Sequence, residues 1–158
     1  MIIDAAPFLR KSSVKTHYRK RRISMAERKL TDLVTTLEPT HSDSRRTILE
    51  YENSVTETFQ NAVAIKVTGN EPVVLGNHYH ARKNEVFLLL QGKIKELILI
   101  NVATGEQTAF YNLGPLTKIV MPHGTAHRFT LAPKSTLLVL STLPYDKSDD
   151  VEWKNFRF

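Results

Sequence analysis

Short apolar segments separated by turn residues recur along the chain from Thr47 onward, and this repetition limits the folds that the chain can adopt. The segments are rich in Val, Ile, Leu and Phe, and the breaks between them include Gly69-Asn70, Thr104-Gly105 and Gly114-Pro115. The expected strands are 47–52, 62–68, 72–75, 85–91, 93–102, 106–112, 117–121, 126–131 and 136–142. Many short strands at this spacing are typical of a β-sandwich or barrel. No helix of useful length fits between them, so we expect an all-β fold.

The region before these strands has a different pattern. Ser24 and Glu27 have the spacing of a capping box, in which each side chain satisfies a free backbone amide of the other residue. Apolar residues then follow at helical spacing, namely Leu30, Leu33, Val34 and Leu37. Pro39 ends the pattern. We therefore expect one amphipathic helix over about 25–37, packed on the barrel or on a second subunit.

The positive charge of the chain is confined to its N-terminal part. The net charge is +6, and residues 1–22 hold seven basic residues and one acidic residue, so the rest of the chain is neutral. A basic arm can contact nucleic acid or an acidic partner, but aromatic residues within it are limited to Phe8 and Tyr18. We expect residues 1–22 to form a basic arm, a solvated extension or a subunit contact, and residues 23–158 to form a single domain. Nucleic acid is not the expected partner.

The composition also excludes several classes of protein. The chain has no cysteine, which rules out disulfides and thiol catalysis, so a metal must be held by His, Asp or Glu. The longest apolar runs, 86–90 and 97–100, are far shorter than the about 20 residues that span a bilayer. We found no secretory signal at the N-terminus. We expect a cytoplasmic protein that does not cross a membrane.

Four polar residues have the spacing of a metal site. Alternation along a strand directs the side chains of His78 and His80 to the same face. Glu85 opens the next expected strand, and a buried carboxylate needs a partner. His127 follows the turn at 122–124 and supplies a third imidazole. Three imidazoles and one carboxylate suit a divalent metal such as Zn, Fe, Mn or Ni.

The full spacing resembles the two motifs of the cupin superfamily. It runs His78-x-His80-x4-Glu85-x6-Gly92 and then Pro122-x-Gly124-x2-His127. The resemblance covers about residues 43–145 and implies a jelly-roll barrel, the double-stranded β-helix, with His78, His80, Glu85 and His127 as metal ligands. Two positions depart from the motifs: Pro72 and Leu131 replace the usual Gly and Asn.

Three further segments are similar to cupins that epimerise or isomerise nucleotide-linked keto-sugars. Asp43-Ser-Arg45-Arg46 resembles their Asp-x-Arg-Gly opening, Leu75-Gly-Asn-His78 their Arg-Gly-x-His strand, and Tyr145-Asp-x-x-Asp149 the tail of the 3,4-ketoisomerases. A similar domain forms half of a capsular-polysaccharide sugar 3-epimerase. The Arg that helps to hold the diphosphate in those enzymes is Leu75 here. Arg45 or Arg46 can replace it, because a guanidinium binds phosphate bidentately.

The resemblance implies an isomerase or epimerase of a keto-sugar, and the reaction allows two versions. Such an enzyme moves a proton beside a carbonyl, so it needs a base and an electrophile. In the first version a metal polarises the carbonyl, and the base is Tyr111, Tyr145 or His123. In the second no metal binds, and His78 and His80 form the acid–base pair. We name His78, His80 and Tyr145 as catalytic candidates, and Arg45, Arg46 and Tyr111 as substrate-binding candidates.

Two other functions remain open at this stage. The same ligands suit an iron- or manganese-dependent dioxygenase, since an octahedral metal would keep two open positions. The missing phosphate Arg and the basic arm favour a non-catalytic cupin that binds a small ligand or a partner. We expect a homodimer in either case.

Overall fold

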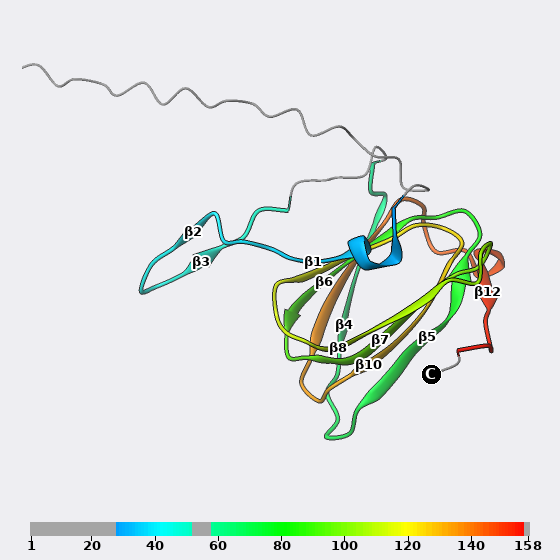
Figure 1. The fold of residues 1–158 in the computed structure, drawn as a ribbon. Coiled ribbons are helices and arrows are strands. Elements are labelled where there is room, and N and C mark those ends of the chain that lie inside the picture. Colours follow the sequence, from blue (N-terminus) through cyan, green and yellow to red (C-terminus); the bar gives the residue numbers. More distant parts are fainter. Residues whose placement is uncertain (1–27, 52–57, 157–158) are drawn as a thin grey trace, which may run out of the picture.

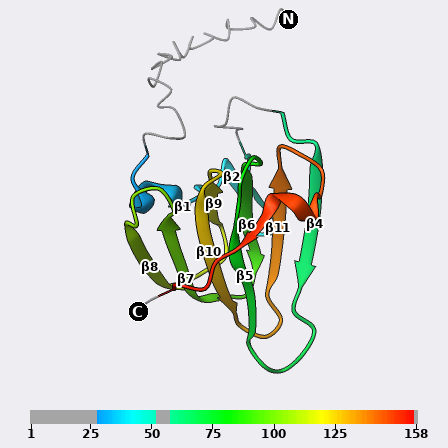
Figure 2. The ribbon, with the colours of Figure 1, turned by 90° about the vertical axis from the view of Figure 1, so that its right-hand side faces the viewer.

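Two antiparallel five-stranded sheets face each other in the computed structural model, which describes residues 28–51 and 58–156. The first sheet has the order β1 (Val34–Thr36), β9 (Thr117–Met121), β6 (Glu85–Gln91), β11 (Thr136–Ser141), β4 (Asn61–Lys66). The second has the order β12 (Asp150–Glu152), β5 (Val73–His80), β10 (Thr125–Leu131), β7 (Ile94–Asn101), β8 (Gln107–Leu113). Figures 1 and 2 show the two layers from perpendicular directions.

Alternation along the central strands builds the core between the sheets. On β6, Phe87 and Leu89 are buried in the central cluster, whereas Val86 and Leu88 pack on the outer face. On β7, Leu97 and Leu99 lie in the same central cluster and Ile98 and Ile100 on the opposite face. Burial of such side chains contributes about 1.5–3 kcal/mol each. The all-β barrel expected from the strand pattern is confirmed.

A small hairpin extends away from the barrel. Its strands β2 (His41–Ser42) and β3 (Thr47–Ile48) pair only with each other among the described strands. Figure 1 shows the hairpin projecting to the left of the barrel, on the side opposite β12. An isolated two-stranded hairpin is marginally stable in water. Asp43 stabilises the turn by accepting hydrogen bonds from the backbone N–H groups of Arg45 and Arg46.

The N-terminal helix expected over about 25–37 is wrong for its described part. Residues Leu30–Leu33 form one 3-10 turn, η2, and β1 follows directly. Leu30 and Leu33 are three residues apart, which suits a 3-10 turn with three residues per turn, and both insert into the core. Val34 pairs with Ile119 on β9 and extends the sheet, which outweighs helix propensity. The basic arm and the capping box lie outside the described residues.

Most strand predictions agree with the structure to within two residues. The exceptions are β5, which runs on from the expected 72–75 to His80, and the segment 47–52, of which only Thr47–Ile48 is a described strand. Strands β1, β2 and β12 were not predicted as strands; β12 follows a short 3-10 turn, η3 (Lys147–Asp149). Within 28–51 and 58–156 there is no helix of the length and apolarity needed to span a bilayer.

Candidate active site

A cavity of about 220 Å³ lies between the two sheets. Strands β4, β6 and β11 of one sheet and β5, β10 and β12 of the other contribute side chains to its wall. Part of the wall is apolar and includes Ile65, Leu75, Phe129 and Leu137. The polar groups of the wall are Asn61, His78, His80, Lys83, Glu85, His127, Ser141, Tyr145 and Asp150. Pockets for drug-sized ligands begin at about 300 Å³, so this cavity suits a ligand the size of one sugar ring.

A β-bulge in β5 directs the histidines into this cavity. His127 pairs with His78, but the next residue of β10, Arg128, pairs with Gly76, so Asn77 is the extra residue. Both Gly76 and Asn77 have positive φ, 88° and 64°. A Cβ at Gly76 would collide with the carbonyl oxygen of His127, so only glycine fits there. The bulge lets Leu75 face the core while His78 and His80 face the cavity.

The three expected imidazoles meet in the structure. The ligand atoms of His78, His80 and His127 lie within 4.8 Å of one another. The Nδ1 atom of His127 lies 3.2 Å from the carbonyl oxygen of Thr125, to which it donates, so Nε2 keeps its lone pair. Burial and the nearby His78 lower the pKa of His127 to about 3, and burial and then the charge of His80 lower the pKa of His78. Both rings are therefore neutral at pH 7.

Glu85 also faces the cavity, and each of its oxygens has a charged or polar side chain nearby. Its Oε2 lies 3.1 Å from Nε2 of His80, and its Oε1 lies 3.5 Å from Nζ of Lys83. Burial alone would raise the pKa of Glu85, but the hydrogen bond from His80 and the charges around it lower the pKa below its ordinary value. The compact donor set for a metal thus consists of three imidazoles, and Glu85 is an ionised partner of His80 and Lys83.

A second carboxylate contacts the other nitrogen of His80. Strand β12 pairs with β5 so that Asp150 is opposite His80, and Asp150 Oδ1 lies 2.8 Å from Nδ1. The two atoms are in contact without a well-aligned hydrogen bond. Because both ring nitrogens face carboxylates, only the protonated ring donates to both. His80 thus has a carboxylate at each ring nitrogen, whereas burial lowers the pKa of the neighbouring His78.

The buried carboxylate of Asp149 fixes the loop between β5 and β6. It accepts hydrogen bonds from the backbone N–H groups of Arg82 at 2.8 Å and Lys83 at 3.3 Å. The Arg82 guanidinium also pairs with Asp146 at 2.6 Å. Sequence reasoning drew attention to Tyr145-Asp-x-x-Asp149 but missed Asp150 and Lys83. The pairing of β12 with β5 brings Asp150 to the site, and no sequence pattern predicts that pairing.

The other predicted residues lie in three different places. Tyr145 lines the cavity and is 69% exposed, so it lies at the mouth. His123 is exposed in the turn before β10, where its Nδ1 lies 3.1 Å from Asn84 Oδ1. Tyr111 pairs with Glu96, while the adjacent Phe110 packs in the core. Alternation therefore puts Tyr111 on the outer face of the sheet, away from the cavity.

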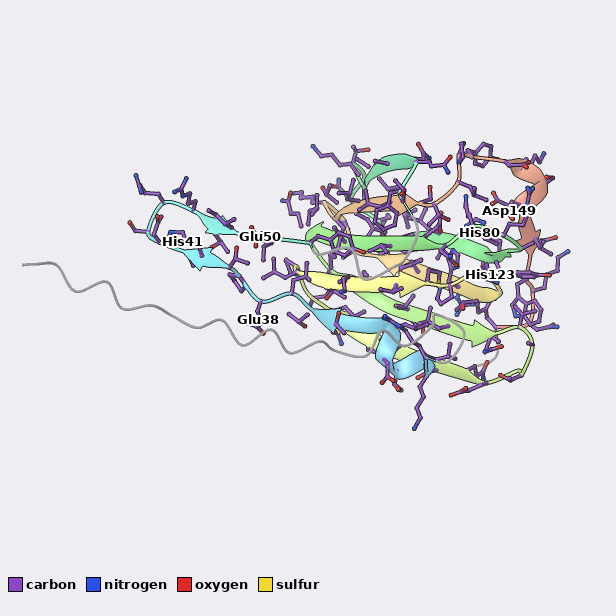
Figure 3. The ribbon with its side chains drawn as sticks, turned by 90° about the horizontal axis from the view of Figure 1, so that it is seen from above. Glu38, His41, Glu50, His80, His123 and Asp149 are labelled. Carbon is purple, nitrogen blue, oxygen red and sulfur yellow. The ribbon has the colours of Figure 1, made fainter. Side chains whose placement is uncertain are left out.

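Arg45 and Arg46 lie in the turn of the β2–β3 hairpin, where both pair with Asp43. In Figure 3, His41 on this hairpin lies beyond one end of the barrel, whereas His80, His123 and Asp149 lie at the opposite end. Within one chain, therefore, the structure does not bring the two arginines to the cavity.

No protein-family model matches the chain, and neither does any curated protein. Several solved structures share its fold. A dTDP-4-dehydrorhamnose 3,5-epimerase from Bacillus anthracis, with TDP and PPi bound, is 22% identical, with a TM-score of 0.65 over 80% of this chain and 81% of that one. A dTDP-6-deoxy-D-glucose-3,5-epimerase from Legionella pneumophila is 16% identical, with a TM-score of 0.65 over 79% and 74%.

A sugar 3,4-ketoisomerase from Thermoanaerobacterium thermosaccharolyticum, in complex with TDP, is 18% identical, with a TM-score of 0.62 over 78% of this chain and 90% of that one. These identities are low, so the similarity concerns the fold. It agrees with the resemblance that the sequence motifs indicated. The chain has the cupin fold of the nucleotide-sugar 3,4-ketoisomerases and 3,5-epimerases.

Proposed function

We propose that this protein is an isomerase or epimerase of a nucleotide-linked keto-sugar. The main support is one arrangement: a neutral His78 and a carboxylate-flanked His80, with ring centroids 4.7 Å apart, in the wall of a cavity large enough for one sugar ring. Neighbouring groups whose environments favour opposite protonation states mark an acid–base pair. Solved structures of the same fold are named as enzymes of this class.

In this proposal His78 removes a proton from the carbon beside the ketone. The electrons of the broken C–H bond form a C=C bond, and the carbonyl electrons move to oxygen to give an enolate. For an epimerisation, His80 returns a proton to the opposite face of the same carbon and the ketone forms again. For an isomerisation, His80 protonates the former carbonyl carbon, while the hydroxyl proton at the carbon that lost its hydrogen moves to the enolate oxygen, so the ketone forms at that carbon. Asp150 and Glu85 contact the two ring nitrogens of His80 and orient the ring. Tyr145, at the mouth, is the third candidate for proton exchange.

The three imidazoles also fit a divalent metal. Their ligand atoms are close together, and His127 is oriented through Nδ1 by a carbonyl, as metal-binding histidines are. His78, His80 and His127 would hold the metal, and Zn, Fe, Mn or Ni suits such a set. A bound metal would polarise the sugar carbonyl. The imidazoles cannot be ligands and proton carriers at once, so chelation separates the two versions.

The diphosphate of such a substrate needs a binding site outside the cavity. Lys83 is the only Lys or Arg among the described lining residues, and it is paired with Glu85. We infer a homodimer in which Arg45 and Arg46 of one hairpin bind the diphosphate at the mouth of the other subunit's cavity. This arrangement gives the exposed hairpin a docking surface and retains the two arginines as substrate ligands. The cytoplasmic location remains part of the proposal.

Mixing two defective variants tests the shared site. His78→Asn removes the base, and Arg45→Ala with Arg46→Ala removes the phosphate ligands. Random mixing gives heterodimers with one intact site, so about a quarter of the wild-type sites should return in the mixed sample. Absence of any recovery, or a monomer mass in light scattering, contradicts the shared site.

A solved structure of one similar 3,4-ketoisomerase contains TDP-4-keto-6-deoxyglucose. Conversion of this sugar nucleotide by the protein tests the function itself. Proton NMR should show the ketone at a new carbon or an inverted centre beside it, and His78→Asn should abolish the change. Binding of the sugar nucleotide without conversion contradicts the proposal and supports a non-catalytic ligand-binding cupin.

A further inference from the structure

Lys83 is a buried cation that neither sequence reasoning nor the acid–base mechanism accounts for. Its side chain is only 6% exposed, and it lies in the loop between β5 and β6. Lysine is almost never fully buried unless it is paired. Lys83 also lines the cavity, together with His78 and His80. A ligand that enters the cavity therefore meets this side chain.

The ion pairs of Lys83 do not occupy its hydrogen-bond donors. Its Nζ lies 3.5 Å from Glu85 Oε1 and 3.8 Å from Asp150 Oδ1. Both distances exceed the about 2.7–3.2 Å of an N–H···O hydrogen bond. The two carboxylates thus stabilise the charge of the ammonium but leave its N–H groups free for an oxygen in the cavity. Since Lys83 lines the cavity, these N–H groups are available to a bound ligand.

The surroundings of Lys83 hold it in place. Asp149 accepts a hydrogen bond from its backbone N–H at 3.3 Å, and Tyr145 lies over the ammonium with its ring centroid 5.8 Å from Nζ. Donors that are fixed before the reaction stabilise developing charge most effectively, because they need not reorganise. Lys83 has the position and the rigidity of such a donor.

We propose that the ammonium of Lys83 stabilises the enolate oxygen during the isomerisation, an inference that rests on the proposed function. When His78 takes the proton, the carbonyl oxygen gains the negative charge, and an N–H group of Lys83 donates to it. In an epimerisation, His80 returns a proton to the same carbon, the C=O bond forms again and the donor is released. In an isomerisation, His80 protonates the former carbonyl carbon, the proton of the adjacent hydroxyl moves to the enolate oxygen, and the new C=O forms at the carbon that lost its hydrogen. In both cases one C–H proton leaves and one is added, and no oxidant or reductant is needed. Lys83 is therefore a catalytic residue.

The other polar groups of the wall are less suited to this role. The two nitrogens of His80 face Asp150 and Glu85, and His78 and His127 belong to the imidazole cluster. Among the described lining residues, the Lys83 ammonium combines a full positive charge with free N–H groups. It supplies electrophilic help at the carbonyl whether or not the imidazoles hold a metal.

Steady-state kinetics of Lys83→Met, Lys83→Gln and Lys83→Arg test this role with a TDP-linked 4-keto sugar. Loss of one oxyanion donor lowers kcat about 10²–10³-fold, and we expect this for Met and Gln, with KM changed by less than about threefold. Lys83→Arg keeps the charge, so its kcat should be at least about tenfold higher than that of Lys83→Met or Lys83→Gln. The matched control is Lys95→Met, at an exposed position on β7.

Each outcome decides between the alternatives. Wild-type kcat in Lys83→Met overturns the inference and leaves the proposed function standing. If the wild type does not convert the TDP-linked 4-keto sugar, the proposed function is overturned, and the inference with it. If Lys83→Met has a lower melting temperature than the wild type, kcat is compared instead between Lys83→Arg and Lys83→Gln at equal melting temperature. A higher kcat for Arg supports the inference, and equal values overturn it.

Discussion

The Nδ1 atom of His80 lies 2.8 Å from Oδ1 of Asp150, although the two residues belong to strands at distant points of the sequence. The other ring nitrogen of His80 lies 3.1 Å from Glu85. His80 therefore has a carboxylate at each ring nitrogen, while burial keeps the nearby His78 neutral. The chemistry that we propose depends on this difference between two adjacent imidazoles.

Replacing Asp150 tests the pairing directly. Asp150→Asn keeps the shape of the side chain but removes the charge beside Nδ1, so His80 becomes a poorer acid–base group. We expect kcat to fall about 10²-fold. Glu152→Gln, an exposed carboxylate on the same strand, is the control and should leave kcat unchanged. Equal kcat values for Asp150→Asn and the wild type would show that Asp150 plays no part.

The bulge in β5 predicts a loss of stability for Gly76→Ala. A Cβ would collide with the His127 carbonyl oxygen, and the positive φ adds strain of about 1–3 kcal/mol. Chemical denaturation should therefore show a larger loss for Gly76→Ala than for Gly105→Ala, where φ is +73° but the space is open. Gly69→Ala has neither feature and should change little. Equal losses at Gly76 and Gly105 would exclude the steric contact.

The lowered pKa of His127 predicts how stability changes with pH in the metal-free protein. The folded pKa of about 3 lies below the ordinary histidine pKa of 6.5, so between these values the unfolded chain binds a proton that the folded chain does not. This contribution is complete above pH 6.5 and is lost as the pH falls toward 3, at up to about 1.4 kcal/mol per unit. The lowered pKa of His78 acts in the same direction.

Denaturation in EDTA between pH 6.5 and 5 measures this dependence. His127→Gln cannot titrate, so its free energy of unfolding should fall less steeply with decreasing pH than that of the wild type. Parallel curves for the two proteins would mean that His127 titrates normally in the folded state.

Metal binding can be measured separately from catalysis. If a divalent metal binds the three imidazoles, Zn²⁺ should raise the melting temperature, because a ligand of the folded state adds RT ln(1 + [L]/Kd) to stability. His127→Gln should abolish the shift, and His123→Gln should retain it, since His123 is exposed in a turn outside the cluster. A shift that survives His127→Gln would place the metal elsewhere.

The sequence predicts the barrel and the positions of three imidazoles well. The strands alternate and are separated by turn residues, so their limits follow from local pattern, and Glu85 faces the core beside Phe87 as alternation requires. The expected helix is wrong for its described residues, 28–37, because Leu30 and Leu33 suit a 3-10 turn equally well and Val34 pairs with β9.

Residues brought by long-range pairing could not be predicted. Asp150 reaches His80 only through the β12–β5 pair, and Lys83 is buried only because the loop is held by Asp149. Tyr111 was selected by its chemistry alone, and the register with Glu96 directs it outward. The positions of Arg45 and Arg46 depend on the hairpin, whose direction relative to the barrel no local pattern determines.

Exchange of substrate hydrogen with solvent tests the proposed chemistry most directly. With a TDP-linked 4-keto sugar in D₂O, the wild-type protein should introduce deuterium at the carbon beside the ketone, seen as the loss of that signal by proton NMR. His78→Asn should introduce none at equal protein concentration. Conversion of the sugar without deuterium, or exchange that is as fast without His78 as with it, would contradict proton transfer by these imidazoles.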